Sequence, residues 1–195
     1  MIILIFGKSG SGKTYLAKYL EKNLTNSIHI DIDKLNNDLY KSPRVQNKAV
    51  EIFGKDIVVN KTIDKQALYN IINTDEKIYK TWVDYMITEC QQFLDLYMKS
   101  TSFNYYIIDH INVHLFNFLD NNIVKILCEE NDDNIRYARL AKRDKISKET
   151  ILFRDKHYIE SDGDITYSGT STDDILNEIK KQRILINTKS WTILI

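Results

Sequence analysis

Residues 7–14 read Gly7-Lys8-Ser9-Gly10-Ser11-Gly12-Lys13-Thr14 and match the pattern G-x-x-x-x-G-K-[ST]. The apolar run Ile2–Phe6 precedes them directly, and Leu16, Leu20 and Leu24 recur behind them at helical spacing. We therefore expect a buried parallel strand, a glycine-rich turn and a helix, in that order. This is the context in which the pattern forms a phosphate-binding loop and not an ordinary glycine turn.

Each part of this loop has a physical role in holding a nucleoside triphosphate. The glycines let the backbone curl so that successive N–H groups point at phosphate oxygens, and the helix adds the positive end of its dipole. Lys13 is expected to reach the β- and γ-phosphates, and the Thr14 hydroxyl to bind Mg²⁺. The predicted ATP-binding residues are Gly7, Gly10, Ser11, Gly12, Lys13, Thr14 and Tyr15.

Length and composition narrow the class of protein. The 195 residues suit one domain, or a core domain with an inserted helical part, and the net charge of zero gives no argument for a nucleic-acid or membrane partner. The apolar start, Met1–Phe6, is short and lacks a basic lead, so we expect a core strand and not a signal peptide. Cys90 and Cys128 lie far apart without metal-ligand spacing, which favours a reducing, cytoplasmic setting.

Two further predicted strands end in carboxylates. Ser27–Ile30 runs into Asp31 and Asp33, and the apolar run Tyr105–Ile108 ends in Asp109. Ligands of open α/β sheets bind at the carboxyl ends of the strands, and an Asp in the position of Asp109 holds Mg²⁺ directly or through water. Asp31 and Asp109 equally fit a structural role as caps of the turns that follow.

The region from about residue 34 to 101 interrupts the β–α alternation and is helical by pattern. Pro43 and Gly54 bound one predicted helix, and residues 75–98 predict a long amphipathic one. Its expected core-facing stripe consists of Ile78, Trp82, Met86, Cys90, Phe93 and Tyr97. An insertion of this kind in a phosphate-loop protein usually holds the second substrate.

The alternation resumes with a predicted strand at 124–128 and a helix at 131–143 that carries Arg136, Arg139 and Arg143. A break at 143–147 and a short helix ending near Arg154 have the character of a mobile lid, although a charged run also fits a solvated face. We interpret His110 and His114 as structural. A last strand at 165–167 and a final helix from about 171 precede the apolar tail 191–195, which fits an edge strand or a contact with another chain.

Together these elements predict an α/β fold of the P-loop NTPase and kinase type, with a parallel sheet flanked by helices. We expect a single domain over residues 1–195, with the core at about 1–33 and 102–195. The helical acceptor-binding insertion is expected at about 34–101 and the lid at about 143–158.

The order of elements and several short motifs resemble the dephospho-coenzyme A kinase family over nearly the whole chain, up to about Gln182. Beyond the loop at 7–14, residues 30–34 (IDIDK) are similar to the family's I-D-A-D-K, and residues 52–57 (IFGKDI) with 63–68 (IDKQAL) to its F-G-x-x-I and I-D-R-x-x-L. Residues 139–144 (RLAKRD) are similar to its R-L-x-x-R-D. Later matches are Arg154, Asp162, Ser168 and Gly169.

This resemblance implies transfer of the γ-phosphoryl group of ATP to the ribose 3′-hydroxyl of dephospho-CoA, giving CoA and ADP. It implies Asp33 as the general base and Arg143 and Arg154 as arginines that close over the phosphates. The implied catalytic residues are thus Lys13, Asp33, Arg143 and Arg154, with ATP and Mg²⁺ as cofactors and Thr14 and Asp109 as metal ligands. The implied partner is the small molecule alone, without nucleic acid or membrane, and the chain is expected to be a monomer or weak oligomer.

The sequence departs from the family where the acceptor and adenine surroundings are expected. Lys80-Thr81 stands for the family's His-Pro, His110–Val113 follows Asp109 in place of its x-P-L-L, and Tyr167 stands for its late Asn. These changes leave open a nucleoside or deoxynucleotide kinase, a regulatory nucleotide-binding protein without catalysis, and a degenerate kinase. The 52–68 motifs argue against the regulatory protein, as does the absence of a glycine directly after Asp109.

Overall fold

The structure is a computed structural model that describes residues 1–118, 122–144, 147–169 and 171–192. It divides into two compact units, Met1–Asp31 with Phe103–Ile195, and Ile32–Ser102. The candidate base Asp33 belongs to the second unit. None of the helices in the described part of the chain has the length and apolar character that crossing a bilayer requires.

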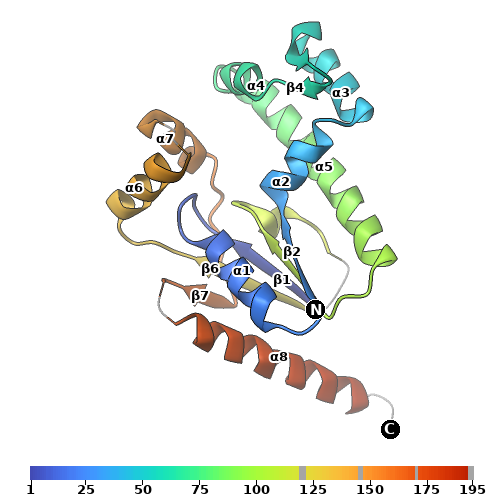
Figure 1. Cartoon of the computed structure of the whole chain (residues 1–195), viewed down its shortest axis with the longest axis vertical. Coiled ribbons are helices and arrows are strands. Elements are labelled where there is room, and N and C mark those ends of the chain that lie inside the picture. Colours follow the sequence, from blue (N-terminus) through green and yellow to red (C-terminus); the bar gives the residue numbers. More distant parts are fainter. Residues whose placement is uncertain (119–121, 145–146, 170, 193–195) are drawn as a thin grey trace. The chain divides into compact units, whose positions relative to one another are not determined.

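The first unit is built on a parallel sheet. Its strands are β1 (Ile2–Phe6), β2 (Ser27–Asp31), β5 (Tyr105–Asp109), β6 (Ile123–Cys128) and β7 (Ile165–Tyr167). They lie in the order β2-β5-β1-β6-β7, and every neighbouring pair is parallel (Figure 1). β1 is central and fully buried, which explains its uninterrupted apolar sequence. The expected α/β fold with a parallel sheet is confirmed.

The strand register places the acidic residues at one edge of this sheet. Asp109 is opposite Asp31 on one side and opposite Ile5 on the other. The loop that follows Phe6 therefore starts at the same edge as these carboxylates, since parallel strands all end on one side.

Helices of the first unit are α1 (Lys13–Asn23), α6 (Asp133–Asp144), α7 (Lys148–Lys156) and α8 (Thr172–Thr192), with a short 3-10 turn η2 at Val113–Leu115. Ser147 caps α7 by accepting a hydrogen bond from the Thr150 N–H, as its position before the helix predicts. The edge-strand interpretation of the tail is wrong for Trp191 and Thr192, because α8 continues through them. Residues 193–195 lie outside the described part.

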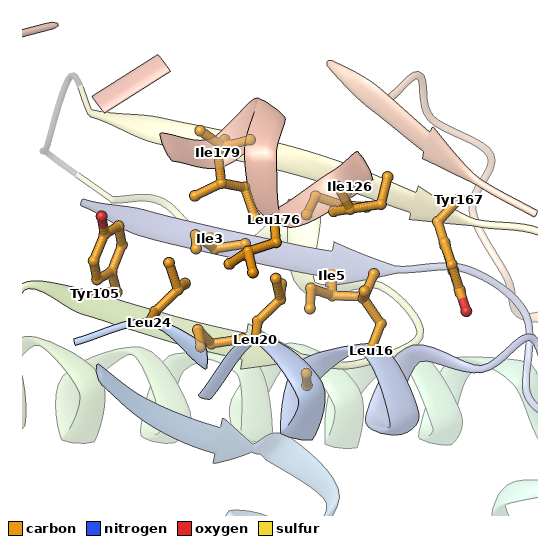
Figure 2. Close-up of a cluster of buried hydrophobic side chains, with 14 of the residues drawn as sticks. Ile3, Ile5, Leu16, Leu20, Leu24, Tyr105, Ile126, Tyr167, Leu176 and Ile179 are labelled. Atoms are coloured by element: carbon orange, nitrogen blue, oxygen red, sulfur yellow. The ribbon is translucent and has the colours of Figure 1, made fainter. Parts of the chain in front are cut away.

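The main core lies between β1 and two helices on the same face of the sheet (Figure 2). Ile3 and Ile5, two residues apart on β1, point to this face because side chains alternate along a strand. Leu16 and Leu20 of α1 and Ile179 of α8 pack against them, each without exposed surface. Burial of this cluster anchors α1, and with it the loop that α1 begins.

On the other face of β1, Phe6 packs against the ring of His114, with 5.0 Å between ring centroids. Both ring nitrogens of His114 are buried and lack a hydrogen-bond partner among the described residues. Burial, with the nearby charges of Lys125 and His110, lowers the pKa of His114 below its ordinary value. His114 is therefore neutral in the folded chain, which agrees with its structural interpretation.

This lowered pKa predicts a loss of stability in mild acid. When the pH falls below about 6.5, His114 binds a proton in the unfolded chain but not in the folded chain, because its pKa is lower in the folded chain. The free energy of unfolding therefore decreases. We expect His114→Phe, which cannot titrate, to lose less stability than the wild type between pH 7.5 and 5.0. Urea unfolding at the two pH values measures this, and equal losses in both proteins would contradict it.

The second unit is helical. Its elements are α2 (Ile32–Leu39), α3 (Pro43–Phe53), η1 (Lys55–Ile57), β3 (Val58–Val59), β4 (Thr62–Ile63), α4 (Lys65–Ile72) and α5 (Glu76–Ser100). Pro43 starts α3 and Gly54 follows its end, as predicted. Asp64 and Asp75 cap α4 and α5 by accepting two backbone N–H bonds each.

Trp82 of α5 is the centre of this unit's core. It is 2% exposed and packs edge-on against Phe53 with 5.2 Å between ring centroids. The predicted stripe of α5 is correct at Trp82, Met86 and Cys90 but wrong at Phe93, which is 41% exposed while Leu94 is fully buried. The buried positions continue at a spacing of four residues, and Phe93 stacks on Tyr97 outside the core.

Candidate nucleotide-binding site

The backbone of the loop between β1 and α1 requires its glycines. Gly7 has a φ of +136°, and a Cβ added to it would lie 2.1 Å from the Cys128 carbonyl oxygen. Gly10 has a φ of +84°, and its added Cβ would lie 2.8 Å from Cγ of Arg136. Larger side chains would displace β6 or α6, so the tight curl of the loop depends on these two positions.

Lys13 folds back across this loop. Its Nζ donates hydrogen bonds to the carbonyl oxygens of Gly7 at 2.8 Å and Lys8 at 2.9 Å. The ammonium group therefore lies at the concave side of the loop, where phosphate oxygens can take the place of these carbonyls. Gly12 precedes α1 without any side-chain cap, which leaves the first N–H groups of the helix available to an anion.

Two predicted ATP-binding residues differ sharply in exposure. Ser11 is 4% exposed, and its hydroxyl lacks a hydrogen-bond partner among the residues described. Tyr15 is 65% exposed on the first turn of α1. The Ser11 hydroxyl is thus available to form a hydrogen bond within the loop, whereas the Tyr15 ring faces solvent.

The two predicted metal ligands contact each other. The Thr14 hydroxyl donates to Oδ2 of Asp109 at 2.7 Å, and Oδ1 of Asp109 lies 2.7 Å from Nε2 of His29. Burial alone would raise the pKa of Asp109, but the hydrogen bonds from His29 and Thr14 hold it below its ordinary value. The carboxylate is therefore ionised at neutral pH although it is 4% exposed.

This pair fits Mg²⁺ bound together with a nucleotide. Hydroxyl and carboxylate oxygens are the hard ligands that Mg²⁺ prefers, and it usually takes one or two from the protein beside water and phosphate. Among the described residues, no group of three or more His, Cys, Asp or Glu could hold a metal ion. Thr14 and Asp109 are thus two oxygen ligands that could hold such an ion.

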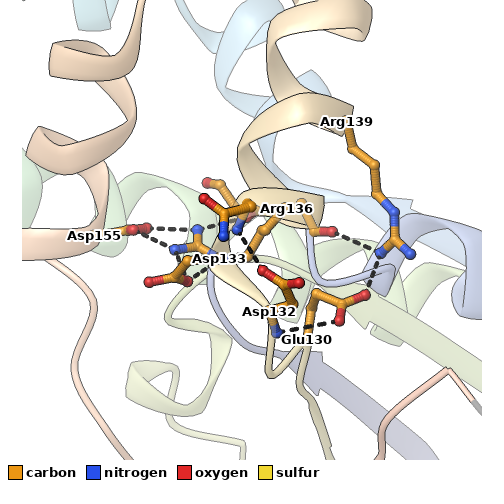
Figure 3. Close-up of polar contacts among 9 residues, drawn as sticks. Glu130, Asp132, Asp133, Arg136, Arg139 and Asp155 are labelled. Atoms are coloured by element: carbon orange, nitrogen blue, oxygen red, sulfur yellow. Dashed lines mark hydrogen bonds and ion pairs between the residues drawn. The ribbon is translucent and has the colours of Figure 1, made fainter.

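Arg136 of α6 forms a buried brace between the loop and the helices that follow β6 (Figure 3). It is 1% exposed, and its Nη1 donates to the Ser9 carbonyl oxygen and to Asp155 of α7, both at 2.9 Å. Nη2 donates to Asp133 at 2.7 Å. One guanidinium group therefore joins the phosphate-binding loop, α6 and α7.

Arg139, one turn further along α6, also approaches the loop. Its Nη1 lies 3.5 Å from the Gly10 carbonyl oxygen and 2.9 Å from Oε2 of Glu130 (Figure 3). This side chain is half exposed, so it can change partners at low cost.

The other predicted site residues are distributed as follows. Arg143 is exposed near the end of α6, and Arg154 is half-buried on α7. Asp33 is exposed on the first turn of α2, two residues after Asp31. Arg136 and Arg139 contact the loop, although the sequence indicated them only as members of a basic helix.

His29 was also missed, because it lies 80 residues from Asp109 in the chain. Its contact arises from the pairing of β2 with β5, and no spacing within the sequence reports which strands are neighbours. The one available signal was a polar ring between the two isoleucines of the strand, Ile28 and Ile30.

A pocket of about 460 Å³ lies beside the loop and reaches the residues after β6 and α7. Its lining includes Lys8, Ser11 and Arg136, but also the carboxylates of Glu129, Glu130, Asp133, Glu160 and Asp162. Because acidic side chains outnumber basic ones there, this pocket is less suited to phosphate than the loop N–H groups and Lys13 are.

Comparison with known proteins agrees with this geometry. Residues 3–160 match the model of a family described as "AAA domain". The chain is similar to a dephospho-CoA kinase from Mycoplasma genitalium, with 23% identity over 171 residues that cover 80% of this chain and 85% of that protein.

Among solved structures, the fold is similar to that of TT1252 from Thermus thermophilus. The TM-score is 0.72 at 18% sequence identity, and the match covers 96% of this chain and 97% of that one. At this level of identity the likeness supports the fold alone. It extends over both units of the chain.

Proposed function

The chain belongs to the AAA domain family, and from that premise we propose that it is an ATP-dependent kinase that phosphorylates the ribose 3′-hydroxyl of dephospho-CoA. The resemblance to dephospho-CoA kinases, first indicated by short motifs, is borne out by the curated relative. The observation that carries the kinase chemistry is the Thr14–Asp109 pair next to a loop whose lysine faces inward. The acceptor is supported by the motifs at residues 30–34 and 52–68.

Catalysis of phosphoryl transfer depends mainly on position and charge, because the transition state is loose. The loop N–H groups and the start of α1 hold the triphosphate, and Lys13 neutralises charge on its terminal phosphates. Mg²⁺, when bound at Thr14 and Asp109, supplies further positive charge to the phosphate oxygens. His29 keeps Asp109 oriented and ionised for that role.

Asp33 receives the proton of the acceptor hydroxyl. It lies on α2, two residues beyond the carboxyl end of β2, and it is exposed. A weak base is sufficient, because the proton leaves late in a loose transition state. Arg143 on α6 and Arg154 on α7 belong to the proposed lid at about 143–158, of which residues 145 and 146 lie outside the described part. The two arginines approach the transferred group when the lid closes and excludes water.

We place this activity in the cytoplasm and expect a monomer or weak oligomer. Cys90 and Cys128 are both free and buried, which supports a reducing compartment.

The decisive experiment measures ADP release with ATP and Mg²⁺, with and without dephospho-CoA. Nucleosides and deoxynucleotides are assayed in parallel. Strong stimulation by dephospho-CoA alone is expected. Turnover with a nucleoside or deoxynucleotide instead would support the kinase chemistry but contradict dephospho-CoA as the acceptor.

The second candidate is a nucleoside or deoxynucleotide kinase. It is favoured by the departures from the family at Lys80-Thr81, His110–Val113 and Tyr167. All three fall where the motifs of the family concern the acceptor or the adenine ring, and none falls in the loop.

Asp33→Asn is expected to lower kcat by at least about tenfold, because the amide cannot accept the hydroxyl proton. The affinity for ATP should stay near the wild-type value, since the loop is unchanged. Steady-state kinetics and a nucleotide-binding titration separate the two. Asp38→Asn, which removes another exposed carboxylate on α2, paired with Lys41 at 2.7 Å, should leave kcat unchanged. Full turnover by Asp33→Asn would rule out its role as base.

A further inference from the structure

A polar cluster lies within the helical unit, between α3 and α5. We call Arg44, Tyr85 and Glu89 the Glu89 cluster. Glu89 is 7% exposed, and Nη2 of Arg44 lies 2.8 Å from its Oε1. That guanidinium is not aligned as a hydrogen-bond donor, so Oε1 lacks a hydrogen-bond partner among the described residues. The buried Tyr85 hydroxyl lacks one as well.

This arrangement costs folding free energy unless further hydrogen-bond donors reach the buried carboxylate. A buried carboxylate needs hydrogen bonds as well as an opposite charge to offset its lost hydration. Arg44 supplies the opposite charge, and its own side chain is 63% exposed. Burial raises the pKa of Tyr85, and the nearby negative charge of Glu89 raises it further. Tyr85 therefore keeps its proton beside the Glu89 carboxylate.

The cluster is electrostatically connected to the candidate base. The thiol of Cys90, the residue after Glu89, donates to Oδ1 of Asn36 on α2 at 3.1 Å. Burial raises the pKa of this thiol to about 12, and the charges of Glu89 and Asp33 both contribute. Asp33 on α2 and Glu89 on α5 thus act on the same thiol, within one unit of the chain.

We propose that Glu89 and Tyr85 bind the nucleoside end of the acceptor, with Arg44 beside an anionic group attached to it. This rests on the proposed function, in which Asp33 takes a proton from a ribose hydroxyl. The groups next to that hydroxyl are the second ribose hydroxyl and the base. Ribose and amino donors match Oε1 of Glu89, and a ring nitrogen matches the Tyr85 O–H. A guanidinium group with free N–H donors suits phosphate.

The competing explanation is that the ion pair between Arg44 and Glu89 only joins α3 to α5. Kinetics with Tyr85→Phe and Glu89→Gln separate the two, because a structural pair would change stability without changing acceptor binding. Tyr85→Phe removes a single oxygen and preserves the ring, so it keeps the test valid if Glu89→Gln fails to fold. We expect either variant to raise the KM for dephospho-CoA about five- to tenfold and to leave the KM for ATP unchanged.

A matched control is available on α3. Lys48 forms an ion pair with Glu51 at 2.6 Å on this helix, and the Glu51 side chain is 66% exposed. Lys48→Met should change neither KM. An unchanged KM for dephospho-CoA in both folded test variants would overturn the proposal.

A binding measurement tests the same idea without turnover. AMP is titrated by calorimetry into the full chain with its loop saturated by a non-hydrolysable ATP analogue and Mg²⁺, and phosphopantetheine is titrated separately. We expect both variants to weaken AMP binding at least fivefold and to leave phosphopantetheine unaffected. Absence of AMP binding in the wild type, or equal binding in wild type and variants, would overturn the proposal.

The two ideas fail in different ways. Wild-type protein that binds AMP through the Glu89 cluster but does not phosphorylate dephospho-CoA would contradict the proposed acceptor alone. Turnover of dephospho-CoA with normal KM in both variants would contradict the role of the cluster alone.

Discussion

Lys13→Ala is expected to lower kcat by roughly a hundredfold or more, the range found when a donor aimed at transition-state charge is removed. Lys13 Nζ lies at the concave side of the loop, 2.8 Å from the Gly7 carbonyl oxygen. No other side chain of the predicted ATP-binding set carries a positive charge. Alanine would leave the terminal phosphates without that charge partner, while the glycine-dependent backbone stays as it is.

Lys8→Ala is the matched control for this prediction, since it removes a lysine of the same loop. Lys8 contributes its carbonyl to Lys13, which alanine retains, and its side chain lines the acidic pocket. We expect a much smaller loss of kcat, with thermal unfolding confirming that both variants fold. Equal effects of the two substitutions would show that bulk charge of the loop matters and that the position of Lys13 does not.

Arg136→Met is expected to have the largest effect on stability. It removes a buried guanidinium group that binds Ser9, Asp133 and Asp155, and it leaves the Asp155 carboxylate, 14% exposed, without that cation. Breaking a buried ion pair from one side costs about 3–5 kcal/mol in free energy of unfolding. Methionine fills much of the same space, so the loss reflects the charge and its hydrogen bonds more than a cavity.

Urea unfolding measures this loss. Arg139→Met serves as the control, because its pair with Glu130 is half exposed and is expected to contribute only about 0–1 kcal/mol. Arg136→Met should also weaken ATP binding, since the Ser9 carbonyl loses its donor and that part of the loop loses its link to α6. A change of less than about 1 kcal/mol in Arg136→Met would contradict its role as a brace.

Local patterns predicted most of the fold. The loop at 7–14 and the strand and helix on either side of it lie within 24 residues, so their motif and spacing were sufficient. The cap at Ser147 was also predictable, because a cap acts on residues two or three positions away. Phe93 shows the limit of this reasoning. Its spacing suited the predicted stripe, but the packing of α5 buried the adjacent Leu94 instead.

The sequence by itself determined the phosphate-binding loop, the parallel α/β class and the family resemblance, because each depends on residues close together in the chain. Only the tertiary structure decided that His29 orients Asp109, that Arg136 joins the loop to α6 and α7, and that Glu89 is buried beside Tyr85. These contacts depend on which strands are neighbours and which helix faces meet. Burial and the loss of hydration then set the charge state and the hydrogen-bonding capacity of each group.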